Sequence, residues 1–344
     1  MKYKNIIMMF ALFAIVFNAC NRDEVFEREM YKARVALKGN TVGGFNIFEQ
    51  EHDLDMADAS GWTKGFISAN VGGSLPTTER IVLSINEDMA LLNDYNQVNF
   101  STDDYKYARS LSKDRYQVGK REIEIPAGAR NGIMQISFKL EGLSPDSMYT
   151  IPFKVEKSSA YEMNLDKSTV LYRPHFKNFW STTKTITEYS HRGYLLQNSR
   201  LDEEPTPTRT PTYLNKRVYP VSRNEIRLNC GTKAFSTNDD PQQAIPKWSM
   251  RIKIADEGIA GSPVRPVTIE AWDKSHLGIE VEQVDDENFD GNDRYLNTYE
   301  LVDDGFGKLF RTFRLCYDYT NPDDGTKYRI WEELRLEYKP LTIQ

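Results

Sequence analysis

Short stretches of alternating apolar and polar residues run through the first half of the chain, and a period of two is typical of half-buried β-strands. Turn formers such as Pro126-Ala127-Gly128 separate these stretches. The segment 89–96 suits one or two helical turns, with Asp88 placed as an N-cap. The pattern predicts a β-sandwich over residues 30–160. The apolar strand faces are Tyr31, Ala33, Val35 and Leu37; Ile81, Leu83 and Ile85; Ile123 and Ile125; Met134, Ile136, Phe138 and Leu140; and Tyr149, Ile151, Phe153 and Val155.

The second half of the chain contains a longer series of strand-like stretches. They follow one another from residue 194 to residue 338, joined by short turn sequences such as Asp303-Asp304-Gly305. Consecutive hairpins form a meander, and a meander loses its two exposed edges most simply by closing into a barrel. We therefore expect an antiparallel, lipocalin-like β-barrel over residues 175–344, with a second β-sandwich as the alternative. Residues 158 to about 178 break the alternation, and the boundary between the two domains is expected there.

The N-terminus has the pattern of an export signal. Lys2 and Lys4 precede an apolar run from Ile6 to Phe17, which is shorter than the roughly 20 residues of a membrane-spanning helix. The run ends at Ala19-Cys20, which resembles a lipobox in which the cysteine is acylated. This predicts a signal peptide over 1–19, lipidation at Cys20 and a tether over 20–29; an ordinary signal peptide with an unrelated cysteine is the alternative.

The distribution of charge along the chain narrows the classes of partner that the protein could bind. The net charge is −6, and acidic and basic residues are spread along the chain. The lack of a basic stripe argues against nucleic acid as a partner.

The two cysteines of the second half fall on different strand faces. Cys230 shares a face with apolar Ile226 and Leu228, whereas Cys316 lies on the face opposite the apolar residues of its own strand. The two thiols should therefore point away from each other, and no disulfide is expected.

Three strings in the first half resemble a known family. "IVLSINEDMALLNDYN", "YQVGKREIEIPAGARNG" and "YTIPFKVEK" are similar to the N-terminal domain of surface lipoproteins from Bacteroidetes polysaccharide-utilisation loci. "FRLCYDYTNPDDGTKYRIWEELRL" is similar to the domain that commonly follows it. Asp23 and Glu24 also resemble the surface-export signal of such lipoproteins. The matching residues are Asp88, Tyr95, Asn96, Ile125, Pro126, Ala127, Gly128, Ile151 and Pro152.

The resemblance implies glycan binding at the cell surface, beside a glycan importer complex. We expect a non-catalytic lipoprotein, lipid-anchored to the outer membrane, in which an immunoglobulin-like sandwich carries a barrel-like binding domain. A structural or adhesive surface lipoprotein that contacts a protein partner is one alternative. A glycoside hydrolase with dispersed carboxylates is another, because glycosidases need two carboxylates placed in space rather than in sequence.

No motif predicts an enzyme or a cofactor. The four histidines, at 52, 175, 191 and 276, are isolated from one another. The chain contains no His-Glu-x-x-His metal motif and no Gly-x-Ser-x-Gly elbow.

One acidic stretch resembles the first half of a calcium loop. Asp286, Asn288 and Asp290 alternate before Gly291, as the first oxygen ligands of such a loop do. The twelfth position is Asn297, which cannot supply the bidentate carboxylate. Calcium binding is thus a weak expectation, and a solvated hairpin is the alternative.

Aromatic residues offer the remaining signal, because sugars stack on flat rings. Trp248 alternates with apolar residues and is expected in the core. Trp272 and Trp331 fall among the polar residues of their strands, and they are the leading candidates for glycan contact. Tyr299 is a further candidate. The alternative for the tryptophans is packing beneath a loop or against the first domain.

Overall fold

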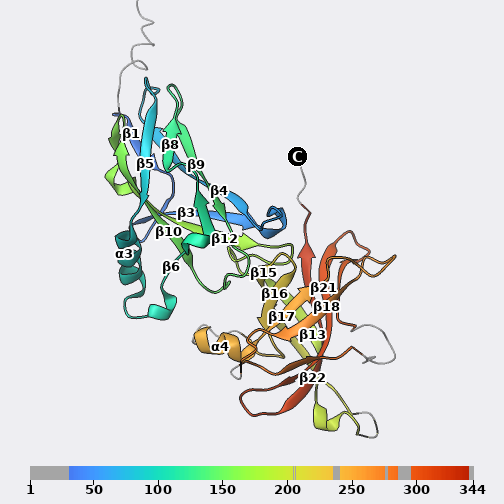
Figure 1. The fold of residues 1–344 in the computed structure, drawn as a ribbon. Coiled ribbons are helices and arrows are strands. Elements are labelled where there is room, and N and C mark those ends of the chain that lie inside the picture. Colours follow the sequence, from blue (N-terminus) through green and yellow to red (C-terminus); the bar gives the residue numbers. More distant parts are fainter. Residues whose placement is uncertain are drawn as a thin grey trace, which may run out of the picture.

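The chain forms two all-β domains that follow one another in sequence (Figure 1). The computed structural model describes residues 31–203, 205, 207–234, 241–275, 278–285 and 296–340, with the backbone alone at 241–243. Cys20 and the calcium candidates Asp286, Asn288 and Asp290 lie outside the described residues. Within these ranges no helix is long and apolar enough to cross a bilayer.

Two sheets pack face to face in the first domain, which confirms the predicted all-β sandwich architecture. The first sheet has the order β11-β1-β4-β9-β7 and the second the order β2-β3-β12-β10-β5-β8, with β6 paired to β10. The strands of the first are β11 (Glu162–Met163), β1 (Arg34–Leu37), β4 (Thr63–Gly72), β9 (Asn131–Phe138) and β7 (Tyr116–Val118). Those of the second are β2 (Asn40–Val42), β3 (Phe45–Asp53), β12 (Thr169–Lys177), β10 (Tyr149–Ser158), β5 (Ile81–Glu87), β8 (Glu122–Ile125) and β6 (Arg109–Ser110).

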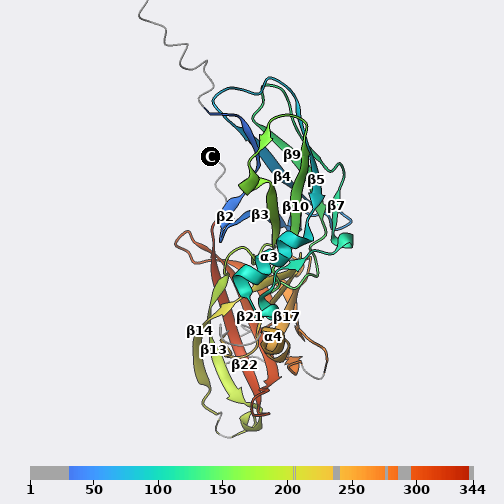
Figure 2. The same ribbon diagram turned by 90° about the vertical axis from the view of Figure 1, so that its left-hand side faces the viewer.

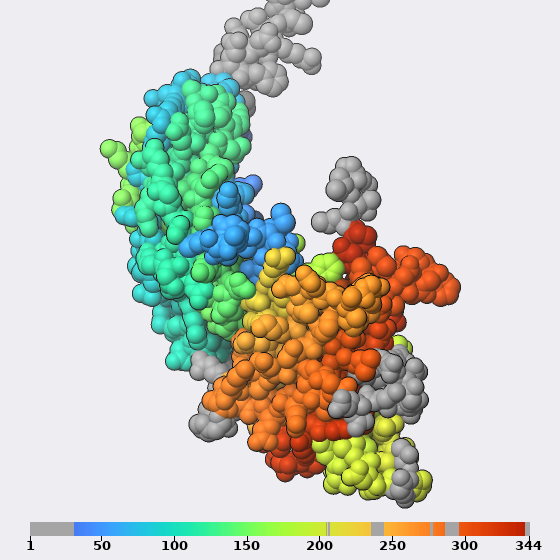
Figure 3. All heavy atoms as spheres, turned by 45° about the vertical axis from the view of Figure 1, so that its right-hand side comes forward, coloured from blue at the N-terminus to red at the C-terminus, as the bar shows by residue number. Residues whose placement is uncertain are grey.

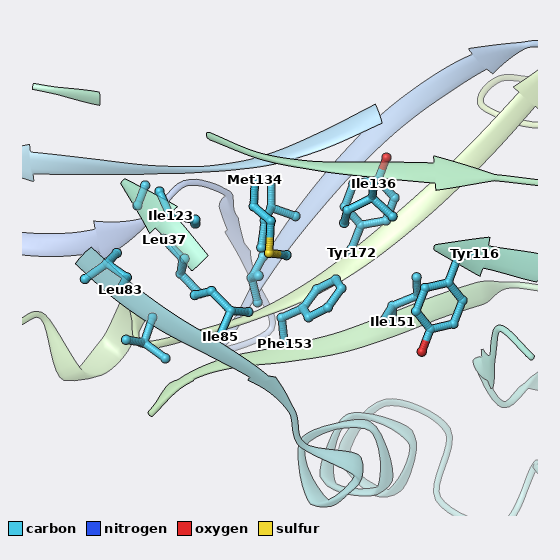
Figure 4. Packing of buried hydrophobic residues seen from close by; sticks show 14 of the residues in the cluster. Leu37, Leu83, Ile85, Tyr116, Ile123, Met134, Ile136, Ile151, Phe153 and Tyr172 are labelled. Carbon is cyan, nitrogen blue, oxygen red and sulfur yellow. The ribbon is translucent and has the colours of Figure 1, made fainter. Parts of the chain in front are cut away.

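The apolar faces predicted from alternation meet in the core between these sheets. Leu83 and Ile85 of β5 face Met134 and Ile136 of β9 across the sandwich (Figure 4). The apolar strand positions predicted for this domain are buried, with two exceptions: Tyr31, which precedes β1, is 72% exposed, and Tyr149, the first residue of β10, is half-buried. Alternation therefore identified the inner face of these strands.

Three features of the first domain differ from the sequence prediction. Strands β3 and β4 were not predicted, and β12 lies where the domain boundary was expected. β12 pairs with both β3 and β10, so the first domain extends through Lys177. The helix α3 (Met89–Phe100) is also longer than predicted, although Asp88 caps it as expected by accepting a hydrogen bond from the Ala90 amide.

The length of α3 follows from its packing. The helix lies on the outer face of the second sheet (Figure 2), where Leu92 and Tyr95 join Ile47 and Leu171 in a small apolar cluster. Burial of one helix face compensates for the weak tendency of a short peptide to form a helix. The other helices are short: η1 (Leu54–Met56), η2 (Asp104–Lys106), η3 (Lys113–Arg115), η4 (Leu165–Lys167), η5 (Asn198–Arg200) and α4 (Pro241–Trp248).

The second domain is one curled sheet with the order β14-β13-β22-β21-β20-β18-β17-β16-β15, and β19 pairs with β21. Its strands are β13 (Glu188–Gln197), β14 (Thr210–Arg217), β15 (Tyr219–Ser222), β16 (Glu225–Asn229), β17 (Ser249–Ile254), β18 (Arg265–Ala271), β19 (Val281–Gln283), β20 (Thr298–Asp303), β21 (Leu309–Thr320) and β22 (Lys327–Tyr338). The first strand, β13, pairs with the last, β22, as barrel closure requires.

The two ends of this sheet, β14 and β15, are joined by the chain itself and not by hydrogen bonds between two edge strands. β14 pairs with β13, while β15 pairs with β16, and only Val218 separates β14 from β15. The extended segment 210–222 therefore bonds to one neighbour in its first part and to the other neighbour in its second part. This arrangement gives the barrel-like curl that the meander predicted.

The interior of this curled sheet contains a buried charged network. Lys216 Nζ lies 2.5 Å from Glu332 Oε2, and His191 Nε2 lies 3.0 Å from the same oxygen. Tyr317 donates a hydrogen bond to the other carboxylate oxygen, at 3.0 Å. Burial would raise the pKa of Glu332, but Lys216 and His191 outweigh that effect and hold the pKa at about 2. The carboxylate is therefore ionised and paired, as a buried charge must be.

The two thiols, Cys230 and Cys316, lie on opposite faces of the sheet of the second domain, as the alternation predicted. Cys230 belongs to the inner core, and Cys316 to a smaller outer cluster. Both are buried. Burial also raises the pKa of the Cys230 thiol, which keeps the thiol protonated and unreactive.

Trp331 occupies the same outer cluster as Cys316, and this corrects its predicted exposure. The residue falls on the outer face of β22, as expected, but its side chain is fully buried. Leu196 packs against it, and Leu201 and Val284 from the segments after β13 and β19 cover the cluster. Trp331 therefore offers no free ring to a ligand and packs beneath a loop, as the alternative described.

An ion pair joins the two domains. Arg227 on β16 binds both carboxylate oxygens of Asp146, which lies in the segment before β10, with Nη2 at 2.6 Å from Oδ1. The Arg227 side chain is fully buried. Its guanidinium also lies 4.7 Å from the Tyr219 ring centroid and 5.3 Å from that of Trp272. Close by, the Gly142 amide donates to the Val221 carbonyl at 3.2 Å.

Replacement of Asp146 tests this connection. Asp146→Asn leaves the buried Arg227 cation without its counter-charge, and we expect the free energy of unfolding to fall by about 3–5 kcal/mol. Urea denaturation measures the change. Asp103→Asn is the matched control, because its pair with Lys106 is exposed and should contribute little. Equal, small effects of both replacements would contradict a structural role for the pair.

A second replacement tests the burial of Trp331. Trp331→Ala opens a cavity under the covering segments and should lower the free energy of unfolding by about 3–5 kcal/mol. Phe306→Ala removes a ring that is 93% exposed and should change it by no more than about 0.5 kcal/mol. Thermal melting of the two variants decides the question, since a Trp331→Ala protein that melts like the wild type would show that the ring is not in a core.

Candidate ligand-binding groove

A groove of about 1200 Å³ lies where the two domains meet. Its walls come from three segments that are distant in sequence: β3 with η1, the segment 177–188 that follows β12, and the adjoining ends of β21 and β22. In Figure 3 the blue segment of the first domain, which includes β3 and η1, reaches toward the second domain. The volume exceeds the 300–1,000 Å³ typical of small-molecule sites, so the groove suits an extended ligand.

Two aromatic side chains and an arginine line the second-domain side of the groove. The rings of Phe179 and Tyr338 are 5.3 Å apart between centroids and tilted by 41°. The Arg311 guanidinium carbon lies 4.6 Å from the Phe179 centroid and 4.8 Å from the Tyr338 centroid. Both rings are half-buried. Cation–π contacts with two rings hold the guanidinium in a fixed position.

Asn178 gives the segment 177–188 its shape. This buried residue donates from Nδ2 to the backbone carbonyls of Ser222 and Glu225, at 2.8 and 3.0 Å. Its Oδ1 accepts from the amides of Trp180 and Ser181, at 3.1 and 3.0 Å. Asparagine side chains stabilise turns in this way, and the turn places Phe179 at the groove.

Buried aromatic residues support the groove from below. Trp180 is 1% exposed, and its carbonyl accepts a hydrogen bond from the Tyr189 hydroxyl at 3.0 Å. Tyr299 packs edge-on against Trp180, with centroids 5.6 Å apart, and touches Phe179 at 6.4 Å. Aromatic packing of this kind makes the second-domain wall rigid.

The first-domain wall of the groove is acidic, and each of its carboxylates contacts another side chain of the protein. Glu51 accepts a hydrogen bond from Thr182 at 2.5 Å. Asp53 lies 3.5 Å from Lys177 Nζ, and Asp55 lies 4.0 Å from Arg223. Burial, together with the neighbouring Asp53, raises the pKa of Asp55 despite opposing contacts from Arg223 and from the Phe179 amide. The contacts of Glu51 with Thr182 and of Asp55 with Arg223 reach beyond the first domain, whereas Asp53 and Lys177 are neighbours on β3 and β12 within it.

The groove combines half-buried aromatic rings with charged and polar side chains. Exposed faces of half-buried aromatic rings can stack on the apolar faces of pyranose rings, while fixed carboxylates, amides and hydroxyls can bond sugar hydroxyls. Among the described residues, no group of three His, Cys, Asp or Glu side chains is arranged to hold a metal ion.

None of the three aromatic residues singled out by sequence lines this groove. Trp331 is buried on the other side of β22, and Tyr299 is 4% exposed and lies beneath the groove wall. Trp272 is half-buried at the domain junction, with the guanidinium groups of Arg227 and Arg251 at 5.3 and 5.0 Å from its ring. Its contacts are therefore internal.

Phe179 and Tyr338 were not singled out, for reasons that the sequence makes clear. Phe179 falls in an irregular segment, next to Trp180, where no periodicity assigns a face. Tyr338 shares the apolar face of β22 and reads as a core residue. Its position at the last residue of the strand is what leaves it only half-covered. Aromatic residues at strand ends were the signal that could have been used.

Comparison with known proteins supports the two-domain arrangement. A family model described as an N-terminal domain matches residues 41–162, and a model described as a C-terminal domain matches residues 168–335. No curated protein matches the chain.

Several solved structures from Bacteroides share the fold. A protein of unknown function from Bacteroides ovatus is 17% identical with a TM-score of 0.60, over 88% of this chain and 94% of that chain. A multidomain protein from Bacteroides ovatus that includes a domain of unknown function is 16% identical, with a TM-score of 0.59 over 88% and 94%. An auxiliary nutrient binding protein from Bacteroides thetaiotaomicron is 13% identical, with a TM-score of 0.56 over 87% and 92%.

These identities show a common fold, and the coverage shows that it extends over both domains. The C-terminal model begins at residue 168 and so includes β12, which in the structure pairs with β3 and β10 of the first domain. The chain thus carries both family-model domains in order and shares its all-β fold with these Bacteroides proteins.

Proposed function

We propose that this protein is a non-catalytic glycan-binding lipoprotein of the outer cell surface and that the groove between its domains is the binding site. The observation that carries the proposal is the pair of half-buried rings, Phe179 and Tyr338, on one wall of a long groove. Rings held in place before the ligand arrives lose little conformational entropy on binding. An array of fixed polar groups on the opposite wall would orient the sugar hydroxyls.

Two further observations support this reading. One of the structures that share the fold is described as an auxiliary nutrient binding protein. The sequence also resembles surface lipoproteins of polysaccharide-utilisation loci. Delivery of a captured glycan to an importer complex would follow from that location.

Loss of one groove ring should weaken glycan binding. Tyr338→Ala removes a stacking surface, and we expect affinity to fall by about 1–3 kcal/mol, as for other aromatic anchors of binding sites. The measurement is binding of the purified protein lacking residues 1–20 to an array of polysaccharides, followed by titration of the glycans that it retains.

Tyr213→Ala is the matched control. Tyr213 lies on β14 outside the groove and is 78% exposed, so its loss should leave glycan affinity unchanged. A Tyr338→Ala protein that folds and binds as well as the control would place the site elsewhere. No glycan bound at all would favour a protein-contacting surface lipoprotein, and released sugar products would indicate a hydrolase.

The lipid anchor is tested separately. Cys20→Ala removes the thiol that would be acylated, and acyl chains are what would hold an otherwise soluble domain pair on the bilayer. The variant should move from the membrane fraction to the soluble fraction without a change in melting temperature. Asn21→Ala, which keeps the cysteine, should stay with the membrane. A Cys20→Ala protein that still fractionates with the outer membrane would refute lipid anchoring at this residue.

A further inference from the structure

We propose, on the basis of the glycan-binding role above, that the groove recognises an acidic glycan and that Arg311 binds its carboxylate or sulfate group. The proposal names the chemical class of the ligand and the residue that selects it. It rests on how the charges in and around the groove are partnered.

Each acidic residue of the groove has a cation of the protein within 4.0 Å, although Glu51 and Asp53 share Lys177. Lys177 lies near both Glu51 and Asp53, at 4.0 and 3.5 Å, Arg223 lies 4.0 Å from Asp55, and Arg217 pairs with Glu188 at 3.1 Å. Paired carboxylates have little capacity to attract a cationic ligand. The acidic wall therefore serves the protein's own stability more than it sets the sign of the ligand's charge.

The cations on the other side of the groove are not neutralised. Arg311, Lys184 and Lys339 line the groove, and no described carboxylate lies within 4.0 Å of any of them. Lys184 and Lys339 are exposed, whereas Arg311 is half-buried. The unpaired charges that face the groove are thus positive.

Arg311 has the features of a ligand-binding arginine rather than a structural one. Its guanidinium is held by two aromatic rings instead of by a carboxylate. Its Nε is buried and makes no hydrogen bond within the protein. The guanidinium also makes a side-chain hydrogen bond with Tyr189, so its partners within the protein are uncharged, and a ligand carboxylate or sulfate can supply the missing anion.

The geometry favours an anionic sugar over a neutral one. A guanidinium donates two parallel hydrogen bonds to a carboxylate or sulfate, and such charge-assisted pairs are roughly twice as strong as neutral ones. The rings that fix Arg311 also provide the stacking surface for the sugar that carries the anion. A uronic acid and a sulfated sugar supply the same chemistry, and matched polymers distinguish them.

The test uses pairs of polysaccharides that differ in charge alone. The probes are polygalacturonate and its fully methyl-esterified form, for carboxylate, and dextran sulfate and dextran, for sulfate. Binding to immobilised probes is measured for the wild type, Arg311→Gln and Arg130→Gln. Arg130 is an exposed arginine on the first domain, outside the groove, without an acidic partner among the described residues, and it controls for general charge attraction.

The expected result is retention of the charged member of at least one pair. Arg311→Gln should weaken that binding by about tenfold or more, the loss expected for a hydrogen bond to a charged group, while Arg130→Gln binds like the wild type. Melting temperatures identify any unfolded variant. Lys184→Gln combined with Lys339→Gln changes exposed residues only, and it should weaken binding of the same polymer even if Arg311→Gln fails to fold.

Other outcomes overturn the inference. Equal binding of charged and uncharged polymers, sensitive to Tyr338→Ala but not to Arg311→Gln, would refute acidic recognition and leave the proposed glycan-binding function standing. If Arg311→Gln and Arg130→Gln weaken binding of the charged polymer equally, the binding is due to general charge attraction and not to Arg311. If the wild-type protein binds none of the polysaccharides, charged or neutral, the result contradicts both the inference and the proposed function.

Discussion

The pairing of Arg227 with Asp146 is the interaction on which the functional arrangement depends. A buried guanidinium needs a counter-charge, and here the carboxylate comes from the other domain. The two domains are therefore held at one relative position near this pair. The groove between them has a defined shape because its first-domain and second-domain walls cannot move apart freely.

The connection between the domains reinforces this constraint. β12 ends at Lys177, in the first domain, and Asn178 immediately bonds to the backbone of the β15–β16 region in the second. No flexible linker intervenes. Inter-domain motion is the usual expectation for two-domain chains, but a direct continuation of this kind favours a single rigid unit, in which the groove is formed before a ligand binds.

β22 explains why residues of opposite character are buried side by side in the second domain. It pairs with both β13 and β21, so its inner face contributes Ile330 and Leu334 to the core together with the paired Glu332. Its outer face is covered as well, at Trp331. The strand leaves an aromatic residue accessible only at its end, where Tyr338 meets the groove.

The sequence by itself determined the local structure. Alternation identified the strands of the barrel-like domain, the inner faces of the sandwich strands and the opposite orientation of Cys230 and Cys316, because a strand's two faces follow directly from its period of two. The cap at Asp88 followed from side-chain chemistry in the same way. These features depend on residues within a few positions of one another.

Only the tertiary structure decided which faces are covered and which residues come together. Alternation assigned Trp331 to an outer face, but Leu201 and Val284, which belong to two other segments, cover it. No local sequence pattern predicts such a contact. β12 became part of the first domain because it pairs with β3, more than one hundred positions earlier in the chain. The groove joins residues near 53, 179, 311 and 338, and their proximity is a consequence of packing between distant segments, which a periodicity of two residues does not encode.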